Sequence, residues 1–428
     1  MTTLSGPAGR PPAPSGPPAG APLVARTVRV RGDVDLLAVA GGSGVLFARG
    51  GCGLGGRGEA LRVPLGTGTG RADAADAAAE ALAGIEHHDE VGVAGSGPVG
   101  FVALPFDDRA PASVVVPSLV AGRSGDGTAW VTTVGPAGEG DRPALVEAVD
   151  GVAPEPRSFR VGSAVSPQAW CEAVASAVAA IRDGGPTKVV LAREVVVEAD
   201  TDLDSRSILD RLAAAAPGSI LYAVDGLIGA SPELLVSRRG DVVRSQPMAG
   251  TTARTGDPGT DAALAATLLA SAKDRAEHQI TIDMVLDTIL AYCSYVDSEP
   301  EPSIAAAGNV QHLASMVEGR LSSPPASVLT LVGALHPTPA VCGWPRAEAL
   351  ALIGELEQGD RGRYAGAVGW LDADGNGSFA VALRGIEIDG RRGRIWAGSG
   401  IVADSDPQTE LAETRAKLQA VLAATVRP

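Results

Sequence analysis

The sequence predicts an α+β fold with a large and mostly antiparallel strand content, and two observations support this prediction. Short runs rich in Val and Leu, separated by Gly, Pro and Asp, fill residues 23–158, as is typical of antiparallel strands joined by turns. After residue 165, segments with helix signals alternate with further strand-like runs. Because both kinds of element are abundant, an α+β domain is expected.

The N-terminal segment differs in composition from the rest of the chain. Residues 1–22 are rich in Pro, Gly and Ala, and they contain no apolar core like that of a signal peptide. We expect a disordered tail here. The remainder, 23–428, is expected to form a single domain with a β-rich part at 23–160 and a second part at 165–428.

In the β-rich part, strands are expected in apolar runs such as LVARTVRV at 23–30, DLLAVA at 35–40 and GVLFAR at 44–49. One helix is expected at 73–85, where the segment is rich in alanine and acidic at its start.

In the second part, helices are expected where helix-forming runs follow capping or proline residues, such as Ser166. The predicted helices cover 167–183, 261–289, 345–357 and 407–424. The predicted strands cover 188–198, 220–224, 233–237, 241–244, 364–371, 378–388 and 393–397.

Composition narrows the classes of function. The 428 residues are 45% apolar and 20% charged, with a formal net charge of −15. An acidic balance argues against nucleic-acid binding. The four cysteines are scattered, which predicts neither disulfides nor a zinc site. No apolar run approaches the ~20 residues of a membrane span. We therefore expect a cytoplasmic protein that binds neither nucleic acid nor membrane.

Two glycine-rich patterns imitate ligand-binding loops. Gly53-x-Gly55-x-x-Gly58 matches a dinucleotide fingerprint, but Pro64 follows too soon for the helix that such a site needs. The segment 372–377, DADGNG, starts like a calcium loop, but its twelfth position is Leu383 instead of Glu. A hairpin turn is the better interpretation of this second pattern.

Five ionisable residues stand out in the second part because of their surroundings. Lys188 opens an apolar strand, Glu233 precedes one, and Glu277 lies in a charged cluster within a helix. Glu410 and Glu413 are three positions apart, so they share one face of a helix. Taken singly, each is most simply a solvated charge, or a lysine that extends to water.

Taken together, the segments that carry these residues resemble the chorismate-utilising enzymes. In the order of that family, the motifs are KVVLAR, GASPELL, QPMAGTTAR, KDRAEHQ, LHPTPAVCG, YAGAVGWLDADGNGSFAVALR, WAGSGIVADSDPQTE and ELAETRAKL. They span about residues 165–425, which marks 165–428 as the catalytic part. The resemblance implies an anthranilate synthase component I-like fold, in which two facing, largely antiparallel sheets enclose the active site with helices outside.

The resemblance also implies that chorismate is the substrate and that Mg²⁺ is the cofactor. It makes Lys188 the general base and Glu233 the general acid, and burial would shift both pKa values in the required directions. It assigns Mg²⁺ to Glu277, Glu410 and Glu413, the last either directly or through water. Oxygen ligands suit this ion.

Further residues would contact the substrate. Arg384, placed in the strand SFAVALR, would bind the enolpyruvyl carboxylate through its guanidinium fork. The other positions that the resemblance places around the substrate are Gly250, Thr251, His336, Thr338, Ala340, Tyr364, Gly398 and Gly400.

Within the family, two features favour an isochorismate synthase of the siderophore type. Lys188 favours water as the nucleophile, because the ammonia-using anthranilate and aminodeoxychorismate synthases resemble each other in lacking this lysine. Ala340 stands where salicylate synthases tend to have threonine. The alternatives are a salicylate synthase, an ammonia-using synthase or a non-catalytic relative.

The resemblance also implies what accompanies the chain. We expect a monomer without a glutaminase subunit, whose product enters siderophore or menaquinone synthesis.

Overall fold

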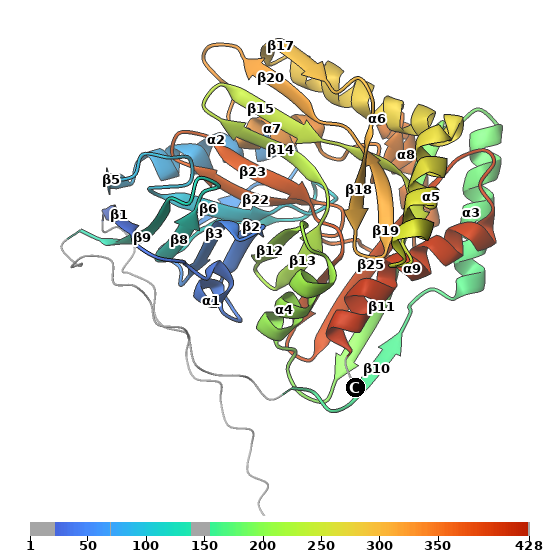
Figure 1. The fold of residues 1–428 in the computed structure, drawn as a ribbon, viewed down its shortest axis with the longest axis horizontal. Coiled ribbons are helices and arrows are strands. Elements are labelled where there is room, and N and C mark those ends of the chain that lie inside the picture. The colour runs from blue at the N-terminus through green and yellow to red at the C-terminus, as the bar shows by residue number, and fades with distance from the viewer. Residues whose placement is uncertain (1–21, 69, 138–154, 427–428) are drawn as a thin grey trace, which may run out of the picture.

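The computed structural model describes residues 22–68, 70–137 and 155–426. The predicted tail lies, except for residue 22, outside the described residues. The fold consists of two large sheets, a small third sheet and helices that pack around them (Figure 1). No helix in these ranges is long and apolar enough to span a membrane.

The largest sheet, sheet A, has thirteen strands within the described residues and is antiparallel except where β1 pairs with β5. Its order is β10 (Phe159–Gly162), β11 (Lys188–Ala199), β25 (Arg392–Ile401), β24 (Gly385–Asp389), β13 (Leu227–Ser231), β12 (Ile220–Val224), β2 (Val45–Arg49), β3 (Cys52–Arg57), β8 (Leu119–Arg123), β9 (Ala129–Pro136), β1 (Leu23–Val30) and β5 (Glu86–Asp89), with β21 (Gly343–Trp344) paired to β11.

Sheets B and C complete the strand content. Sheet B has the order β17 (Cys293–Ser298), β20 (Val317–Leu321), β15 (Val242–Gln246), β14 (Leu234–Arg239), β23 (Gly377–Val381), β22 (Ala367–Asp372), β6 (Val99–Ala103), β7 (Ala112–Val116) and β4 (Leu61–Leu65). Sheet C has the order β16 (Met248–Ala253), β19 (Val310–Ala314) and β18 (Ser303–Ala307).

The helices lie mainly on the outside of this strand assembly (Figure 1). They are α1 (Leu36–Ala40), α2 (Gly70–Ala83), α3 (Pro167–Arg182), α4 (Ser205–Ala215), α5 (Pro258–Ala270), α6 (Ala272–Leu290), α7 (Val328–Leu335), α8 (Arg346–Leu356) and α9 (Pro407–Thr425).

The predicted α+β fold with two facing sheets is confirmed. Phe47 and Leu54 of sheet A share one buried apolar cluster with Phe101 and Trp370 of sheet B, so burial of these side chains holds the sheets face to face. Both large sheets combine strands from the two parts of the chain, as in the pairs β2–β12 and β6–β22. Sheet C was not predicted.

Two predicted elements are each broken into two. The helix expected at 261–289 ends and restarts at Ser271, whose extended backbone (φ −69°, ψ 112°) separates α5 from α6 and whose hydroxyl caps α6 at Asp274 N. The strand expected at 378–388 breaks at Arg384, which has φ +51°. The chain therefore leaves sheet B at β23 and enters sheet A at β24, and Arg384 lies between the sheets instead of within a strand.

Three helices correct the prediction elsewhere. DLLAVA is α1 instead of a strand, because the Asp35 side chain accepts a hydrogen bond from Ala38 N at 2.9 Å and caps the helix. Helices α4 and α7 were not predicted, although Asp204 and Ser327 cap them in the same way. The helices α2, α3, α8 and α9 and the 372–377 hairpin between β22 and β23 are confirmed.

A buried ion pair completes the edge of β11. Between the stretches paired with β21 and β10, the free edge of β11 meets side chains instead of a strand. Glu357 accepts from Ala192 N at 2.7 Å, and Arg361 donates to Val190 O at 2.7 Å. Arg361 and Glu357 bind each other at 2.5 and 2.8 Å, with side chains only 3% and 6% exposed.

Arg361 also ties the two parts of the chain together. Its guanidinium donates to Val341 O at 2.9 Å and lies 4.2 Å above the ring of Phe106. One buried cation thus joins β11, the segment before β21 and a loop of the β-rich part.

We predict that Arg361→Met lowers the free energy of unfolding by about 3–5 kcal/mol, because it leaves the Glu357 carboxylate buried without its partner. Reversible denaturant unfolding measures this change. The control is Arg320→Met, which removes an exposed ion pair to Asp241 and is expected to cost less than about 1 kcal/mol. Equal effects of the two substitutions would contradict the assigned role.

Candidate functional site

The predicted site residues come mainly from three places: sheet A, sheet C and the two helices α6 and α9. The pairing of β11 with β25 runs without interruption from Val189↔Ile401 to Glu198↔Arg392. It aligns Gly400 of β25 with Val190, and the side chain of Lys188, two positions earlier on β11, lies beside Gly400. Helix α9 follows β25 in sequence and packs against it, so its carboxylates are held near the same strand end.

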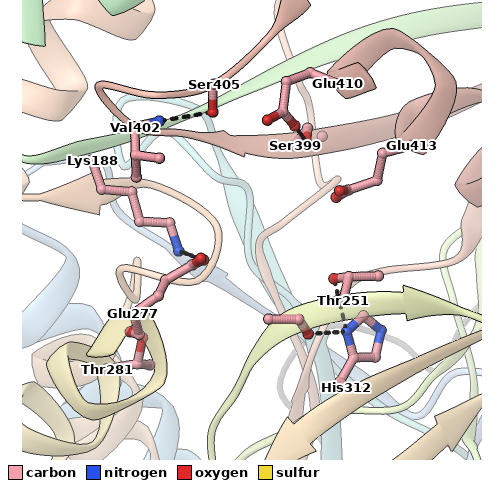
Figure 2. A network of polar contacts seen from close by, with 12 residues as sticks. Lys188, Thr251, Glu277, Thr281, His312, Ser399, Val402, Ser405, Glu410 and Glu413 are labelled. Carbon is pink, nitrogen blue, oxygen red and sulfur yellow. Dashed lines mark hydrogen bonds and ion pairs between the residues drawn. The ribbon is translucent and has the colours of Figure 1, made fainter. Parts of the chain in front are cut away.

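Lys188 is buried, with only 4% of the residue exposed, and its Nζ donates to Glu277 Oε1 on α6 at 2.6 Å (Figure 2). Burial in an apolar site was expected for this lysine, but the ion pair was not. The structure therefore brings the predicted base and one predicted metal ligand into direct contact.

Gly400 makes that contact possible. A Cβ built at this position would lie 2.8 Å from Lys188 Cε and 3.5 Å from Glu277 Oε1. Gly398 plays a similar part for Tyr364, because a Cβ there would lie 3.2 Å from the tyrosine hydroxyl. The two glycines thus leave room for site side chains, a use that was not anticipated from the sequence.

Glu233 lies between β13 and β14 and is 4% exposed. Burial raises the pKa of its carboxyl to about 8, and the opposing effects of the Met248 N–H and of the Lys188 charge are smaller. The carboxyl is therefore largely protonated at neutral pH. A protonated carboxyl can donate a proton, as the predicted general acid must.

Glu410 and Glu413 lie in the first turns of α9, and each has its own partner. Ser399 Oγ donates to Glu410, whose pKa burial raises. Glu413 Oε1 accepts from Lys417 Nζ at 2.6 Å. Burial acts to raise the pKa of Glu413, but Lys417 and Ser399 outweigh it, so the pKa is lowered.

The three predicted magnesium ligands face a common region between α6, β25 and α9 (Figure 2). Their donor chemistry fits Mg²⁺, because all three supply carboxylate oxygens. In this structure, however, Glu277 binds Lys188, Glu410 binds Ser399, and Glu413 binds Lys417. Within the described ranges, no three Asp, Glu, His or Cys side chains are close enough to hold one metal ion.

Arg384 is positioned to receive an anion. Its Nε is buried and has no hydrogen-bond partner among the described residues. Burial lowers the pKa of its guanidinium, while Tyr364 and Glu413 act in the opposite direction. Tyr364 stacks on Trp396 at 6.2 Å between ring centroids, which fixes the tyrosine ring. A buried cation whose donor lacks a partner favours binding of a carboxylate.

His312 is a site residue that the sequence reasoning missed. Its Nδ1 lies 3.1 Å from both Thr251 Oγ1 and Gly250 O (Figure 2). Burial lowers its pKa to about 3, assisted by Arg384, so the ring is neutral at physiological pH. It braces the backbone at Gly250, where φ is +66° and β16 has a bulge. A single histidine within a strand gave no specific signal in the sequence.

The histidine motif before β21 is not brought into this polar group. His336 Nε2 lies 3.3 Å from Phe106 O, and the residue lines a cavity of about 1010 Å³ beside α7 and α8. None of the other predicted site residues lines that cavity. Thr338 is buried, and its hydroxyl has no partner in the described part of the chain, while Ala340 is half-buried. Their contact with a substrate stays a prediction.

Comparison with known proteins places this arrangement in a family. A family model described as chorismate binding enzyme matches residues 54–426. The putative isochorismate synthase MenF of Mycobacterium tuberculosis is 40% identical over 345 residues, which cover 77% of this chain and 87% of that protein. Isochorismate synthase DhbC of Bacillus subtilis is 37% identical over 278 residues, covering 62% and 70%.

The fold agrees with a solved structure of the same kind. The putative 2,3-dihydroxybenzoate-specific isochorismate synthase DhbC of Bacillus anthracis superposes with a TM-score of 0.76 at 31% identity, covering 91% of this chain and 98% of that one. Both the family model and the long alignment with the mycobacterial protein extend over most of the described residues. The chain belongs to the chorismate binding enzyme family.

Proposed function

We propose that the chain is an isochorismate synthase that converts chorismate to isochorismate with Mg²⁺. The observation that carries this proposal is the buried pair of opposite chemistry, Lys188 and a protonated Glu233. Water is a poor nucleophile and hydroxide a poor leaving group, so the reaction needs a base and an acid in one site. The names of the relatives support the same reaction.

In the proposed mechanism, Lys188 reacts as the neutral amine, and its Nζ takes a proton from the water that attacks C2 of the chorismate ring. The ring double bonds shift, and Glu233 gives its proton to the hydroxyl that leaves C4 as water. Glu277 Oε1 stabilises the resulting ammonium of Lys188, since it already accepts a hydrogen bond from Nζ. After the reaction Lys188 carries one extra proton and Glu233 has lost one. Loss of a proton from Lys188 to solvent and uptake of one by Glu233 restore both groups.

The metal would be held by Glu277, Glu410 and Glu413. When bound, Mg²⁺ would neutralise the charge of the ring carboxylate of the substrate. Arg384 would bind the enolpyruvyl carboxylate with Tyr364 at its side, and the Gly250–Thr251 backbone, braced by His312, would shape the opposite wall. We further propose a cytoplasmic monomer without a glutaminase subunit, whose product serves siderophore or menaquinone synthesis.

Product analysis tests the reaction. We expect purified protein with chorismate and Mg²⁺ to form a compound of the same mass as chorismate but different retention on chromatography. Its formation should depend on Mg²⁺ and be indifferent to ammonium. Salicylate with pyruvate would assign the chain to the salicylate synthases despite Ala340. An amino-substituted product would overturn the role of Lys188, and no turnover would indicate a non-catalytic relative.

Substitution of the acid and the base tests the mechanism. Lys188→Ala and Glu233→Gln are each expected to lower kcat by roughly 10²-fold or more, because general acid–base assistance is typically worth that much. In the wild type, activity should fall as the pH rises through about 8, because Glu233 then loses the proton that it must donate. Steady-state kinetics across pH, with circular dichroism to check folding, measure both effects.

The matched control is Asp372→Asn, which alters another buried carboxyl, one that binds the Gly95 N–H and the hairpin residue Asn376 outside the site. The Asp372→Asn variant should retain the wild-type kcat and the same loss of activity as the pH rises through about 8. Near wild-type activity in Glu233→Gln would exclude Glu233 as the general acid. So would a Glu233→Gln variant that remains active and still loses its activity near pH 8.

Glu277→Ala is expected to raise the Mg²⁺ concentration that gives half-maximal activity, because one carboxylate ligand is lost. It should also weaken the stabilisation by Mg²⁺ in a thermal denaturation experiment. Asp283→Asn, an exposed position on the same helix, serves as the control. An unchanged Mg²⁺ dependence in both measurements would exclude Glu277 as a ligand.

A further inference from the structure

Arg193 occupies an unusual place in the packing of β11. Leu191 belongs to the apolar cluster that includes Trp170 of α3, whereas Val195 belongs to the cluster that includes Leu418 of α9. Leu191, Arg193 and Val195 follow each other at intervals of two positions on β11, so their side chains share one face of the strand. Because Arg193 stands between Leu191 and Val195 on this face, it lies at the seam where the two apolar clusters meet. It is only 7% exposed.

The guanidinium of Arg193 is poorly satisfied. Its Nε and Nη1 are buried and have no hydrogen-bond partner in the described part of the chain. The other deeply buried arginine near this strand, Arg361, has a carboxylate and two carbonyl partners. A buried cation with unused donors is unfavourable unless an acceptor is supplied.

The neighbouring charges do not supply that acceptor. Arg415 of α9 acts on Arg193 with the same sign, and no carboxylate among the described residues does so with the opposite sign. Neither arginine forms an ion pair within the ranges 22–68, 70–137 and 155–426. Burial and Arg415 together lower the pKa of Arg193.

Cys171 of α3 also borders Arg193 and acts on it with the opposite sign, but more weakly than Arg415 does. Its Sγ lies 3.5 Å from Pro407 O. Gln408 Nε2 in turn lies 3.6 Å from the same sulfur. Arg193 therefore has a second guanidinium, that of Arg415, and the Cys171 sulfur as neighbours, and no carboxylate among the described residues acts on it.

We propose that a small oxyanion, a phosphate or a carboxylate, binds at this seam between α3, β11 and α9, held by Arg193 with Arg415 at its entrance. The guanidinium fork of Arg193 presents adjacent N–H groups that match two oxygens of such an anion. Lys188 and Arg193 are five positions apart on one strand and face opposite sides of sheet A. The proposed anion site therefore lies on the opposite face of β11 from Lys188.

Binding at this seam links three elements. The anion joins β11 to α9, whose first turns carry Glu410 and Glu413, and it removes the unsatisfied charge from the interior. A ligand that binds only the folded protein raises its stability by an amount that grows with the logarithm of the ligand concentration above the Kd. An anion bound here would hold α9 against β11. Its binding can be measured by a rise in the Tm, independently of enzyme activity.

Titration of the full chain with sodium phosphate, at ionic strength held constant with sodium chloride, tests the proposal. We expect saturable binding to one site by isothermal titration calorimetry and a matching rise in the Tm. Arg193→Met and Arg415→Gln should each raise the Kd about ten-fold or more, since charged hydrogen bonds carry the affinity. Arg206→Met, whose arginine is paired with Asp210 on α4, should leave the Kd unchanged.

Parallel titrations with sulfate and acetate distinguish the kinds of anion. Binding of phosphate and sulfate indicates a tetrahedral oxyanion, and binding of acetate alone indicates a carboxylate ligand. Arg415→Gln keeps the test decisive if Arg193→Met fails to fold, because Arg415 is exposed. Absence of saturable binding for all three anions, or a Kd unchanged in Arg193→Met and Arg415→Gln, overturns the proposal.

Discussion

The buried Glu357–Arg361 ion pair is the interaction on which the geometry of β11 depends. It satisfies the Ala192 N–H and the Val190 carbonyl on the part of this edge that neither β21 nor β10 covers. The opposite edge is paired with β25 along its length. A strand with partners on both edges positions Lys188 at its start, and β25 leads directly into α9, which packs against it. Catalytic side chains gain precision when they stand on such rigid elements.

The site is an arrangement of charges that already have partners. Lys188 pairs with Glu277, Glu413 pairs with Lys417, and Glu410 accepts a hydrogen bond from the Ser399 hydroxyl. Arg384 is the exception, because its buried Nε lacks an acceptor. This difference has a physical meaning: carboxylates with exchangeable partners can turn to a metal ion, whereas an unsatisfied guanidinium favours an incoming carboxylate. The chemistry of a dianionic substrate with a divalent cation fits that pattern, although the chain as a whole is acidic.

Sheet C and the break at Arg384 explain how residues from distant segments meet. The three strands of sheet C carry Gly250, Thr251 and His312 toward the end of sheet A. The left-handed backbone at Arg384 lets the chain pass from sheet B to sheet A and leaves the side chain between them. Without that break, alternation along one strand would place the guanidinium on a fixed face of one sheet.

The sequence by itself determined the α+β class, the facing sheets through the family motifs, and most helices, because capping residues and apolar patterns act locally. It also singled out Lys188, Glu233 and the three carboxylates as candidate site residues, through the family motifs. Only the tertiary structure decided that Lys188 pairs with Glu277 and that Gly400 leaves room for this contact. It also decided that His312 lies against the Gly250 carbonyl. It also placed His336 in a separate cavity. These contacts join positions 60 or more residues apart, so they depend on sheet pairing and burial, which no local pattern encodes.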